Sequence, residues 1–375
     1  MGQAATPTTR TAPRRNLHTA RLAALLAVTS IGAILATLTL QRPSSEVQVA
    51  TQPRQESFAA ASLVPATTTT IEPAQPTIVH DPRPGDLRVL AVADLLPETY
   101  EPGKAALAIG NIAYGQDPAQ RLDLYLPGIE DAPVILFLHS GGWVAGTRTE
   151  IPAMVMRFIE RGYAVVSIDY RLAPDHPYPA AIQDTKLAII WIKELADHSA
   201  LIDGDAIVLY GTSAGGHIAT TAAATAEQFE LVGPGNAPLS FDTSVAGVVS
   251  VAGPTDLVEL YAIPHEWSVG FPEAFLRCSP CSSASLAAAS PLTYVNPDVP
   301  PAYWAYGAED TLVEAVTQAE VIAGAWALAA GAESSWIDIV DNAGHNIDHT
   351  TINQRAVEEF VDMAVAAARA VTQRS

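Results

Sequence analysis

The chain has 375 residues, and its 20 Lys+Arg against 40 Asp+Glu give a formal net charge of −20 at pH 7. Residues 1–42 hold five arginines and no acid, so the rest of the chain carries 15 basic and 40 acidic residues, a net charge of −25. Such a domain repels phosphate backbones and anionic lipid surfaces, which excludes nucleic acid as a partner.

The N-terminal region reads as a basic segment, residues 1–21, followed by an uncharged span, residues 22–40. Nineteen helical residues at about 1.5 Å each reach roughly across the hydrocarbon core of a bilayer. We expect an uncleaved signal anchor, with the arginines before it in the cytoplasm and the following chain outside. A cleaved signal peptide, which would secrete the protein, and a buried helix are the alternatives.

Proline, threonine, serine and glutamine dominate residues 43–84, which include four consecutive threonines at 67–70. Because few large apolar residues are present to bury, we expect residues 41–88 to be an extended, disordered linker. The folded domain is then predicted to occupy residues 89–375.

Strand-like runs alternate with helical patterns through this domain, which predicts a mostly parallel sheet covered by helices on both faces. Two early strands, residues 107–114 and 121–126, flank a turn-rich segment and are expected to form an antiparallel hairpin at the sheet edge. Helices are predicted over residues 151–161, 180–196, 216–226, 312–330 and 351–371.

A buried strand, residues 133–138, runs into the segment His139-Ser140-Gly141-Gly142-Trp143. Consecutive glycines leave backbone N–H groups uncovered, and such groups stabilise the oxyanion formed during acyl transfer. We therefore predict that Gly141 and Gly142 are oxyanion donors, and that His139 braces this loop and does not titrate in catalysis.

A second apolar run ends in Gly211-Thr212-Ser213-Ala214-Gly215 and passes into a helical pattern. Gly-x-Ser-x-Gly at a strand-to-helix junction is typical of a nucleophile elbow, in which glycines on both sides relieve the crowding of a sharp turn. Ser213 is the predicted nucleophile, and the N–H of Ala214 is the third predicted oxyanion donor.

A serine needs a base, which is itself oriented by a carboxylate. The strand-like residues 302–306 end in a loop containing Asp310, which is the predicted acid; Asp256, after the predicted strand 245–251, is the main rival, and Glu309 and Glu314 are weaker ones. The predicted base is His345, in the loop after the alternating residues 336–340.

His18, His80, His176, His198 and His265 lack this strand-end position. His217 lies one turn into the helix that follows the elbow, where a packing role is expected, and His349 falls near the start of the long C-terminal helix.

Residues 260–290, between the two strands that precede Asp256 and Asp310, carry Trp267, Phe271 and Phe275 and are predicted to form a small cap over an acyl pocket. The only two cysteines of the chain, Cys278 and Cys281, lie in this segment. Outside the cytoplasm their spacing suits a small disulfide loop. In a cytosolic chain it would suggest redox activity, for which the expected βαβ context is missing.

Over residues 105–370 the chain resembles the α/β-hydrolase esterases of the hormone-sensitive-lipase and feruloyl-esterase-like type. The resemblance rests on residues 139–143, 162–174, 178–184 and 211–217. It implies the α/β-hydrolase fold and a serine carboxylester hydrolase with Ser213, Asp310 and His345 as triad. Two positions depart from the family: Ser140 replaces a third glycine, and Thr212 replaces a frequent acidic residue.

We therefore predict hydrolysis of small-molecule carboxylic esters through an acyl-enzyme. An amidase or peptidase would use the same groups, and a catalytically silent binding module on the cell surface is the alternative from another class. No phosphate-binding or dinucleotide fingerprint and no clustered Cys/His spacing occurs, so we expect no cofactor and no metal.

Overall fold

The computed structural model describes residues 77–78, 106–226, 242–347 and 352–373. Contacts divide the chain into two units, Met1–Thr70 and Ile71–Ser375, and the first lies outside the described residues. The predicted basic segment 1–21, the apolar span 22–40 and nearly all of the linker therefore fall outside them as well. No helix among the described residues is long and apolar enough to cross a membrane.

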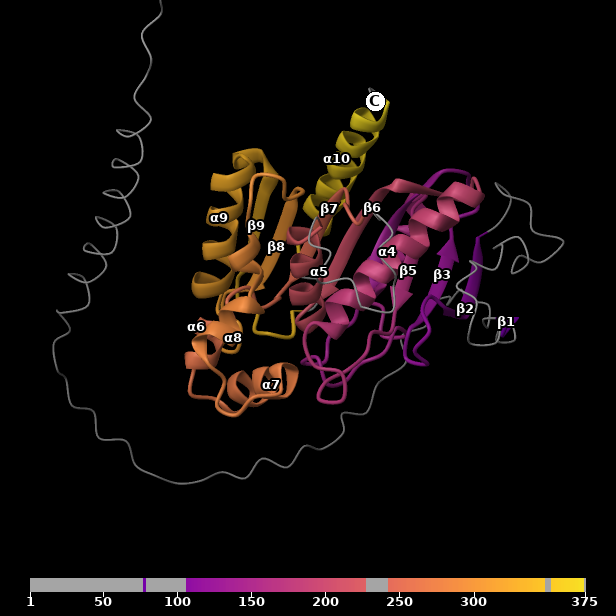
Figure 1. The fold of residues 1–375 in the computed structure, drawn as a ribbon. Coiled ribbons are helices and arrows are strands. Elements are labelled where there is room, and N and C mark those ends of the chain that lie inside the picture. Colours follow the sequence, from indigo (N-terminus) through magenta and orange to yellow (C-terminus); the bar gives the residue numbers. More distant parts are fainter. Residues whose placement is uncertain (1–76, 79–105, 227–241, 348–351, 374–375) are drawn as a thin grey trace, which may run out of the picture. The chain divides into compact units, whose positions relative to one another are not determined.

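Within the described residues, nine strands form one sheet in the order β1-β2-β3-β5-β4-β6-β7-β8-β9 (Figure 1). β3 runs antiparallel to both of its neighbours, and the other pairs are parallel. This confirms the predicted fold class. The strands are β1 (Thr77–Ile78), β2 (Leu107–Ala113), β3 (Arg121–Leu126), β4 (Ala132–Leu138), β5 (Ala164–Ile168), β6 (Ile202–Thr212), β7 (Gly247–Val251), β8 (Ala302–Gly307) and β9 (Ser335–Val340).

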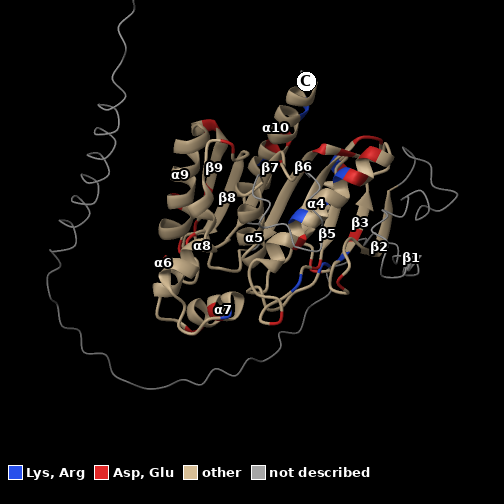
Figure 2. Ribbon diagram, in the orientation of Figure 1, with Lys and Arg blue, Asp and Glu red and all other residues tan. Residues whose placement is uncertain are grey.

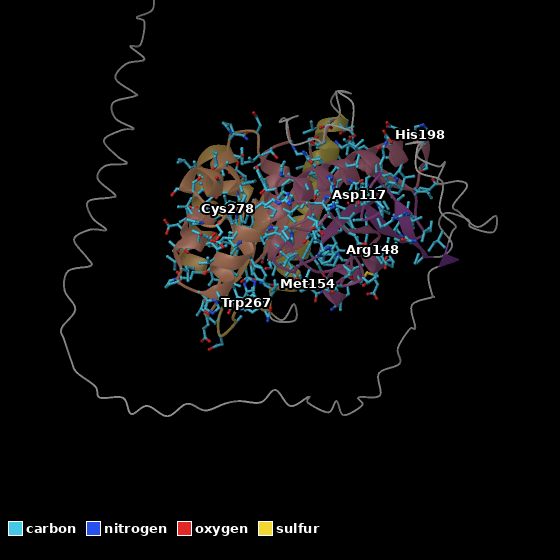
Figure 3. The ribbon with its side chains drawn as sticks, turned by 60° about the horizontal axis from the view of Figure 1, so that its bottom comes forward. Asp117, Arg148, Met154, His198, Trp267 and Cys278 are labelled. Carbon is cyan, nitrogen blue, oxygen red and sulfur yellow. A yellow bond between two sulfur atoms is a disulfide. The ribbon has the colours of Figure 1, made fainter. Side chains whose placement is uncertain are left out.

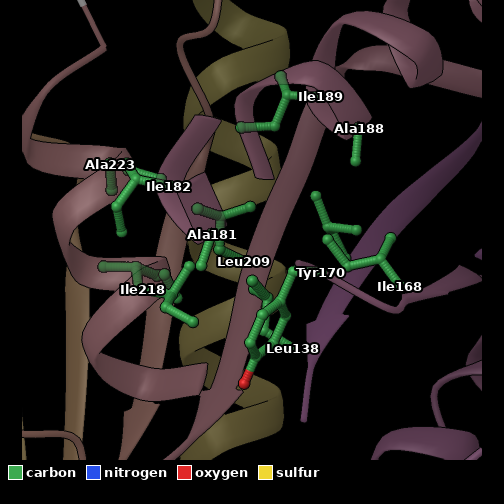
Figure 4. Close-up of a cluster of buried hydrophobic side chains, with 14 of the residues drawn as sticks. Leu138, Ile168, Tyr170, Ala181, Ile182, Ala188, Ile189, Leu209, Ile218 and Ala223 are labelled. Atoms are coloured by element: carbon green, nitrogen blue, oxygen red, sulfur yellow. The ribbon is translucent and has the colours of Figure 1, made fainter. Parts of the chain in front are cut away.

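Helices cover both faces of the sheet because neighbouring residues of each central strand point to opposite sides. Leu136 and Leu209 belong to the core on the face that helices α4 (Ala180–His198), α5 (Ala214–Ala224) and α9 (Val321–Ala330) cover, and part of this core is shown in Figure 4. Ile135 and Val208 pack on the other face with α3 (Ala153–Met156) and α10 (Gln354–Thr372). Strands β4, β5, β7 and β8 carry no charged residue (Figure 2), as expected of strands buried on both faces.

The predicted hairpin is present as β2 and β3, but it is not the outermost part of the sheet. Thr77 and Ile78 pair in parallel with Ile109 and Gly110 of β2. These two residues fall inside the segment expected to be a linker, so this part of it adds a short edge strand to the folded unit.

Two predicted helices differ in form. Over residues 151–161 the chain forms the short α3 and then a 3₁₀ turn, η1 (Ile159–Arg161), closed by Gly162 at φ 87°. Over residues 312–330 the helical backbone begins only at Ala315, as a π-helical stretch, η4 (Ala315–Glu320), before α9. The residues before it are held out of the helix because Leu312 and Val313 donate their N–H groups to the Asp310 carboxylate.

The predicted cap lies between β7 and β8 and consists of α6 (Leu257–Ala262), α7 (Glu266–Leu276) and α8 (Ser283–Ala288). A disulfide joins Cys278 and Cys281 in the turn between α7 and α8. Tyr261 of α6 adds two hydrogen bonds. Its hydroxyl donates to Glu273 of α7 at 2.7 Å and accepts from the N–H of Cys281 at 3.2 Å. The three helices therefore form one connected layer.

Candidate active site

Ser213 stands on a sharp turn between β6 and α5. Its backbone, at φ 52° and ψ −119°, lies in a region that non-glycine residues adopt only when their surroundings enforce it. The backbone around this turn is tightly packed. A Cβ on Gly211 would collide with the carbonyl oxygen of Gly215, and a Cβ on Gly215 would collide with the carbonyl oxygen of Leu138. The two glycines of Gly-x-Ser-x-Gly are thus required sterically, as the sequence predicts for a nucleophile elbow.

His345 and Asp310 meet Ser213 from the ends of β9 and β8. The distance from Ser213 Oγ to His345 Nε2 is 2.9 Å, and that from His345 Nδ1 to Asp310 Oδ2 is 2.8 Å. Since the Asp310 carboxylate accepts from Nδ1–H, Nε2 is free to accept the serine hydroxyl proton. The Asp310 side chain is fully buried, whereas 21% of the His345 side chain is exposed, so the chain of hydrogen bonds runs from the interior to an accessible serine.

The Asp310 loop and the His345 loop are joined by their backbones. The N–H of Glu309 donates to the Ala343 carbonyl at 2.8 Å, and that of Ala308 donates to the Val340 carbonyl at 2.9 Å. This approach depends on Gly307, because a Cβ there would collide with the carbonyl oxygen of Ala343. Gly307 was not singled out from the sequence, although a glycine at the end of a strand that leads to a predicted acid was an available signal.

Gly141 and Gly142 lie in the loop 139–143, which follows β4. Both have positive φ, at 121° and 59°, and the Gly141 carbonyl accepts from the N–H groups of Val144 and Ala145. Within the described part of the chain, the N–H groups of Gly141, Gly142 and Ala214 have no hydrogen-bond acceptor. Ala214 also begins helix α5, whose N-terminus carries a partial positive charge. These groups can receive a developing negative charge.

Asp256, the main rival acid, has a different role. Its carboxylate caps helix α6 by accepting from the N–H groups of Val258 and Glu259. Its backbone is held by Gln318, a buried residue of η4 whose side chain accepts from the Asp256 N–H and donates to the Asp256 carbonyl. No hydrogen bond joins Asp256 to His345 among the described residues.

His139 and His217 are buried and lie beside the site without joining the Ser213–His345–Asp310 chain. His139 Nδ1 donates to the Ser140 carbonyl at 2.7 Å, and its ring stacks on Tyr170, which in turn donates to the His139 carbonyl. Burial lowers its pKa below the usual value for histidine. A neutral His139 braces the loop, in accord with the role predicted for it.

His217 connects three parts of the site. Its Nδ1 accepts from the Trp143 indole N–H at 3.1 Å, and its Nε2 donates to the Ala289 carbonyl, beyond α8, at 2.8 Å. Complete burial lowers its pKa to about 4, so the ring is neutral at pH 7. Trp143 also stacks on Phe275 of α7, with ring centroids 4.7 Å apart. Trp143 and Phe275 both lie in segments singled out from the sequence, but their contact was not predicted, because aromatic residues in an irregular segment give no periodic signal.

A groove lies at the opposite ends of the strands, where β4 and β6 begin. Its lining includes Arg369, which pairs with Asp203 at 2.7 Å, and Arg161, which pairs with Asp362 at 2.6 Å. These are surface ion pairs, and neither belongs to the Ser213–His345–Asp310 chain of hydrogen bonds.

The strand order, the elbow and the covering helices define an α/β hydrolase, and known proteins support this class. A truncated carbohydrate esterase from gut microbiota superposes with a TM-score of 0.59 at 22% identity, over 70% of this chain and 98% of that one. Esterase LipC of Mycobacterium tuberculosis is 32% identical over 63% of this chain and 59% of its own length. Esterase LipQ of the same organism is 34% identical over 61% of this chain and 54% of its own length.

The matched region thus spans less than two thirds of either curated relative. A family model described as BD-FAE matches residues 122–324, which is more than half of the sequence. The chain belongs to the BD-FAE family.

Proposed function

We propose that the protein is a serine hydrolase that cleaves carboxylic esters of small molecules through an acyl-enzyme. The observation that carries the proposal is the hydrogen-bonded series Ser213–His345–Asp310, with distances of 2.9 and 2.8 Å. The esterase names of LipC and LipQ support the same reaction.

In the proposed reaction, His345 Nε2 takes the hydroxyl proton of Ser213 as Oγ attacks the ester carbonyl. The oxyanion accepts hydrogen bonds from the N–H groups of Gly141, Gly142 and Ala214. His345 then gives its proton to the departing alcohol, while the carboxylate of Asp310 stabilises the imidazolium. Water repeats these steps on the acyl-enzyme and releases the acid and the free serine.

The test is Ser213→Ala in the full-length protein, with nitrophenyl acetate as substrate. Loss of the nucleophile should lower kcat by about 10⁶-fold. Ser199→Ala is the control, because the Ser199 hydroxyl donates to the Leu195 carbonyl at the end of α4. This variant should keep the activity of the wild type. A phosphonate ester should label the wild-type protein on Ser213. A folded Ser213→Ala protein that keeps most of its activity would overturn the proposal.

We also propose that residues 22–40 anchor the protein in the cell membrane, with the hydrolase domain outside the cytoplasm. The apolar span, the arginines before it and the Cys278–Cys281 disulfide support this, because disulfides persist in oxidising compartments. The protein should stay with membranes in high salt, and protease added to intact cells should release an active fragment. Spontaneous release with an N-terminus just past residue 40 would indicate a cleaved signal peptide, and cytosolic activity would exclude export.

A further inference from the structure

Helix α7 carries one stripe that is buried and a second, aromatic stripe that the folded protein covers only in part. Ser268, Pro272 and Phe275, spaced at helical intervals, form the buried stripe. One position away on the helix, Trp267 and Phe271 form a second stripe. Their ring centroids are 5.1 Å apart and their planes are tilted by 44°, and Trp267 remains 53% exposed. Figure 3 shows Trp267 at the outer border of the domain.

This second stripe begins at the site itself. The Phe271 ring lies 2.8 Å from the point where a Cβ on Gly142 would stand, so it is in contact with the glycine whose N–H we assign to the oxyanion. Two further contacts hold α7 on this side: Phe275 stacks on Trp143, and its carbonyl accepts from the N–H of Tyr178 at 2.8 Å. An exposed tryptophan alone is unremarkable, but here it continues an apolar surface that leads away from the reacting carbonyl.

The proposed reaction fixes which part of an ester faces that surface. His345 Nε2 must reach the departing oxygen in order to protonate it, so the alcohol lies on the His345 side of the tetrahedral carbon. The acyl chain leaves the same carbon in another direction, away from His345. Helix α7 contacts Gly142 and Trp143 of the oxyanion loop and Tyr178 before α4, and these contacts are the basis for assigning its second stripe to the acyl side.

We propose that Phe271 and Trp267 form the acyl-binding wall, and that the preferred substrates are esters of aliphatic acids of medium chain length. This inference rests on the proposed function. A short chain reaches Phe271 only, whereas a longer one continues onto Trp267. The tilt between the two rings suits a flexible chain, which can follow both surfaces, better than a flat aryl group, which stacks on one.

The chain-length dependence follows from the hydrophobic effect. Each methylene that leaves water for this wall should raise kcat/KM about fourfold. Truncation of the Trp267 ring removes the outer part of the wall and should therefore lower kcat/KM for nitrophenyl octanoate about tenfold. The value for nitrophenyl acetate should change less than twofold, because an acetyl group does not extend to Trp267.

The experiment compares wild type, Trp267→Ala and Trp267→Phe as full-length proteins, with nitrophenyl esters from acetate to octanoate and with acetates of increasingly long alcohols. Trp267→Phe keeps an apolar ring and should keep most of the octanoate activity. Leu328→Ala is the control, because Leu328 is also apolar and is 89% exposed, but lies on α9. It should leave the whole series unchanged.

The possible outcomes separate this inference from the proposed function. A loss in Trp267→Ala that grows with acyl length supports the wall. An equal loss on acetate and octanoate, no loss on either, or a loss that follows alcohol length overturns it while ester hydrolysis stands. A wild-type protein that hydrolyses neither acetate nor octanoate overturns both proposals together.

Discussion

The Ser213 edge of the sheet and the cap beside it are held together in different ways. At the sheet edge, close backbone contacts determine the geometry: Gly211, Gly215 and Gly307 each face a carbonyl oxygen that leaves no room for a Cβ. In the cap, side chains determine it: Phe275 packs on Trp143, and His217 ties Trp143 to the Ala289 carbonyl. The first region is therefore intolerant of any added atom, whereas the second depends on the shape and protonation of a few rings.

The largest difference in activity between the two regions is expected from replacing one carboxylate in each, Asp310 at the sheet edge and Asp256 at the start of the cap. Asp310→Asn should lower kcat about 10⁴-fold, because an amide in place of the carboxylate no longer fixes the required tautomer of His345 or stabilises its cation. Asp256→Asn is the matched control at the neighbouring strand end, where the carboxylate only caps α6. It should cost about 1 kcal/mol of stability or less and little activity. Steady-state kinetics and thermal melts measure both, and the reverse ranking would move the acid to Asp256.

The three residues that the proposed function uses could be named from the sequence because strand ends leave a strong signal in it. Ser213, Asp310 and His345 each follow an apolar or alternating run at the point where it ends, and parallel strands bring such points to one edge of the sheet. What periodicity did not predict is local backbone form. The helix expected from residue 312 starts three residues later, because Leu312 and Val313 donate their N–H groups to the Asp310 carboxylate. Such a contact within the loop leaves no trace in helical periodicity.

The second prediction tests the steric requirement at the sheet edge. Gly307→Ala should push the His345 loop away from Asp310, because the new Cβ meets the carbonyl oxygens of Ala343 and Gly344. A displacement of about 1 Å in such a site costs on the order of 100-fold in rate. Gly324→Ala is the matched control: a Cβ there meets no atom within 4 Å, and alanine should stabilise α9 by up to about 1 kcal/mol. Unchanged kcat/KM in a folded Gly307→Ala protein would contradict this account.

The cap was predictable only as a segment. Its aromatic residues and its cysteine pair suggested a small cap with a disulfide, and both are present. Its contacts were not predictable, because Phe271 meets Gly142 and Phe275 meets Trp143 across more than a hundred residues of sequence, where neither helical nor strand periodicity carries information. Linker composition also failed to indicate β1, since pairing with β2 depends on a free edge and not on the residues of the linker.

The smallest predicted effect concerns the cap and is a dependence of stability on pH. The pKa of His217 is lowered by burial to about 4, against about 6.5 in an unfolded chain. Between these values the unfolded state binds a proton that the folded state does not, so stability falls as the pH drops from 6.5 towards 4. At pH 5 the loss should be about 2 kcal/mol relative to pH 7.

His217→Gln isolates this contribution, because a glutamine amide can still accept from the Trp143 indole and donate to the Ala289 carbonyl but does not titrate. Carboxylates elsewhere titrate equally in both proteins, so the difference in the free energy of unfolding between pH 7 and pH 5 should be about 2 kcal/mol smaller in the variant. Denaturant titrations at the two pH values measure it. Parallel pH profiles for the two proteins would mean that His217 is not held neutral. In that case the ring between Trp143 and Ala289 would not be what couples the cap to the oxyanion loop.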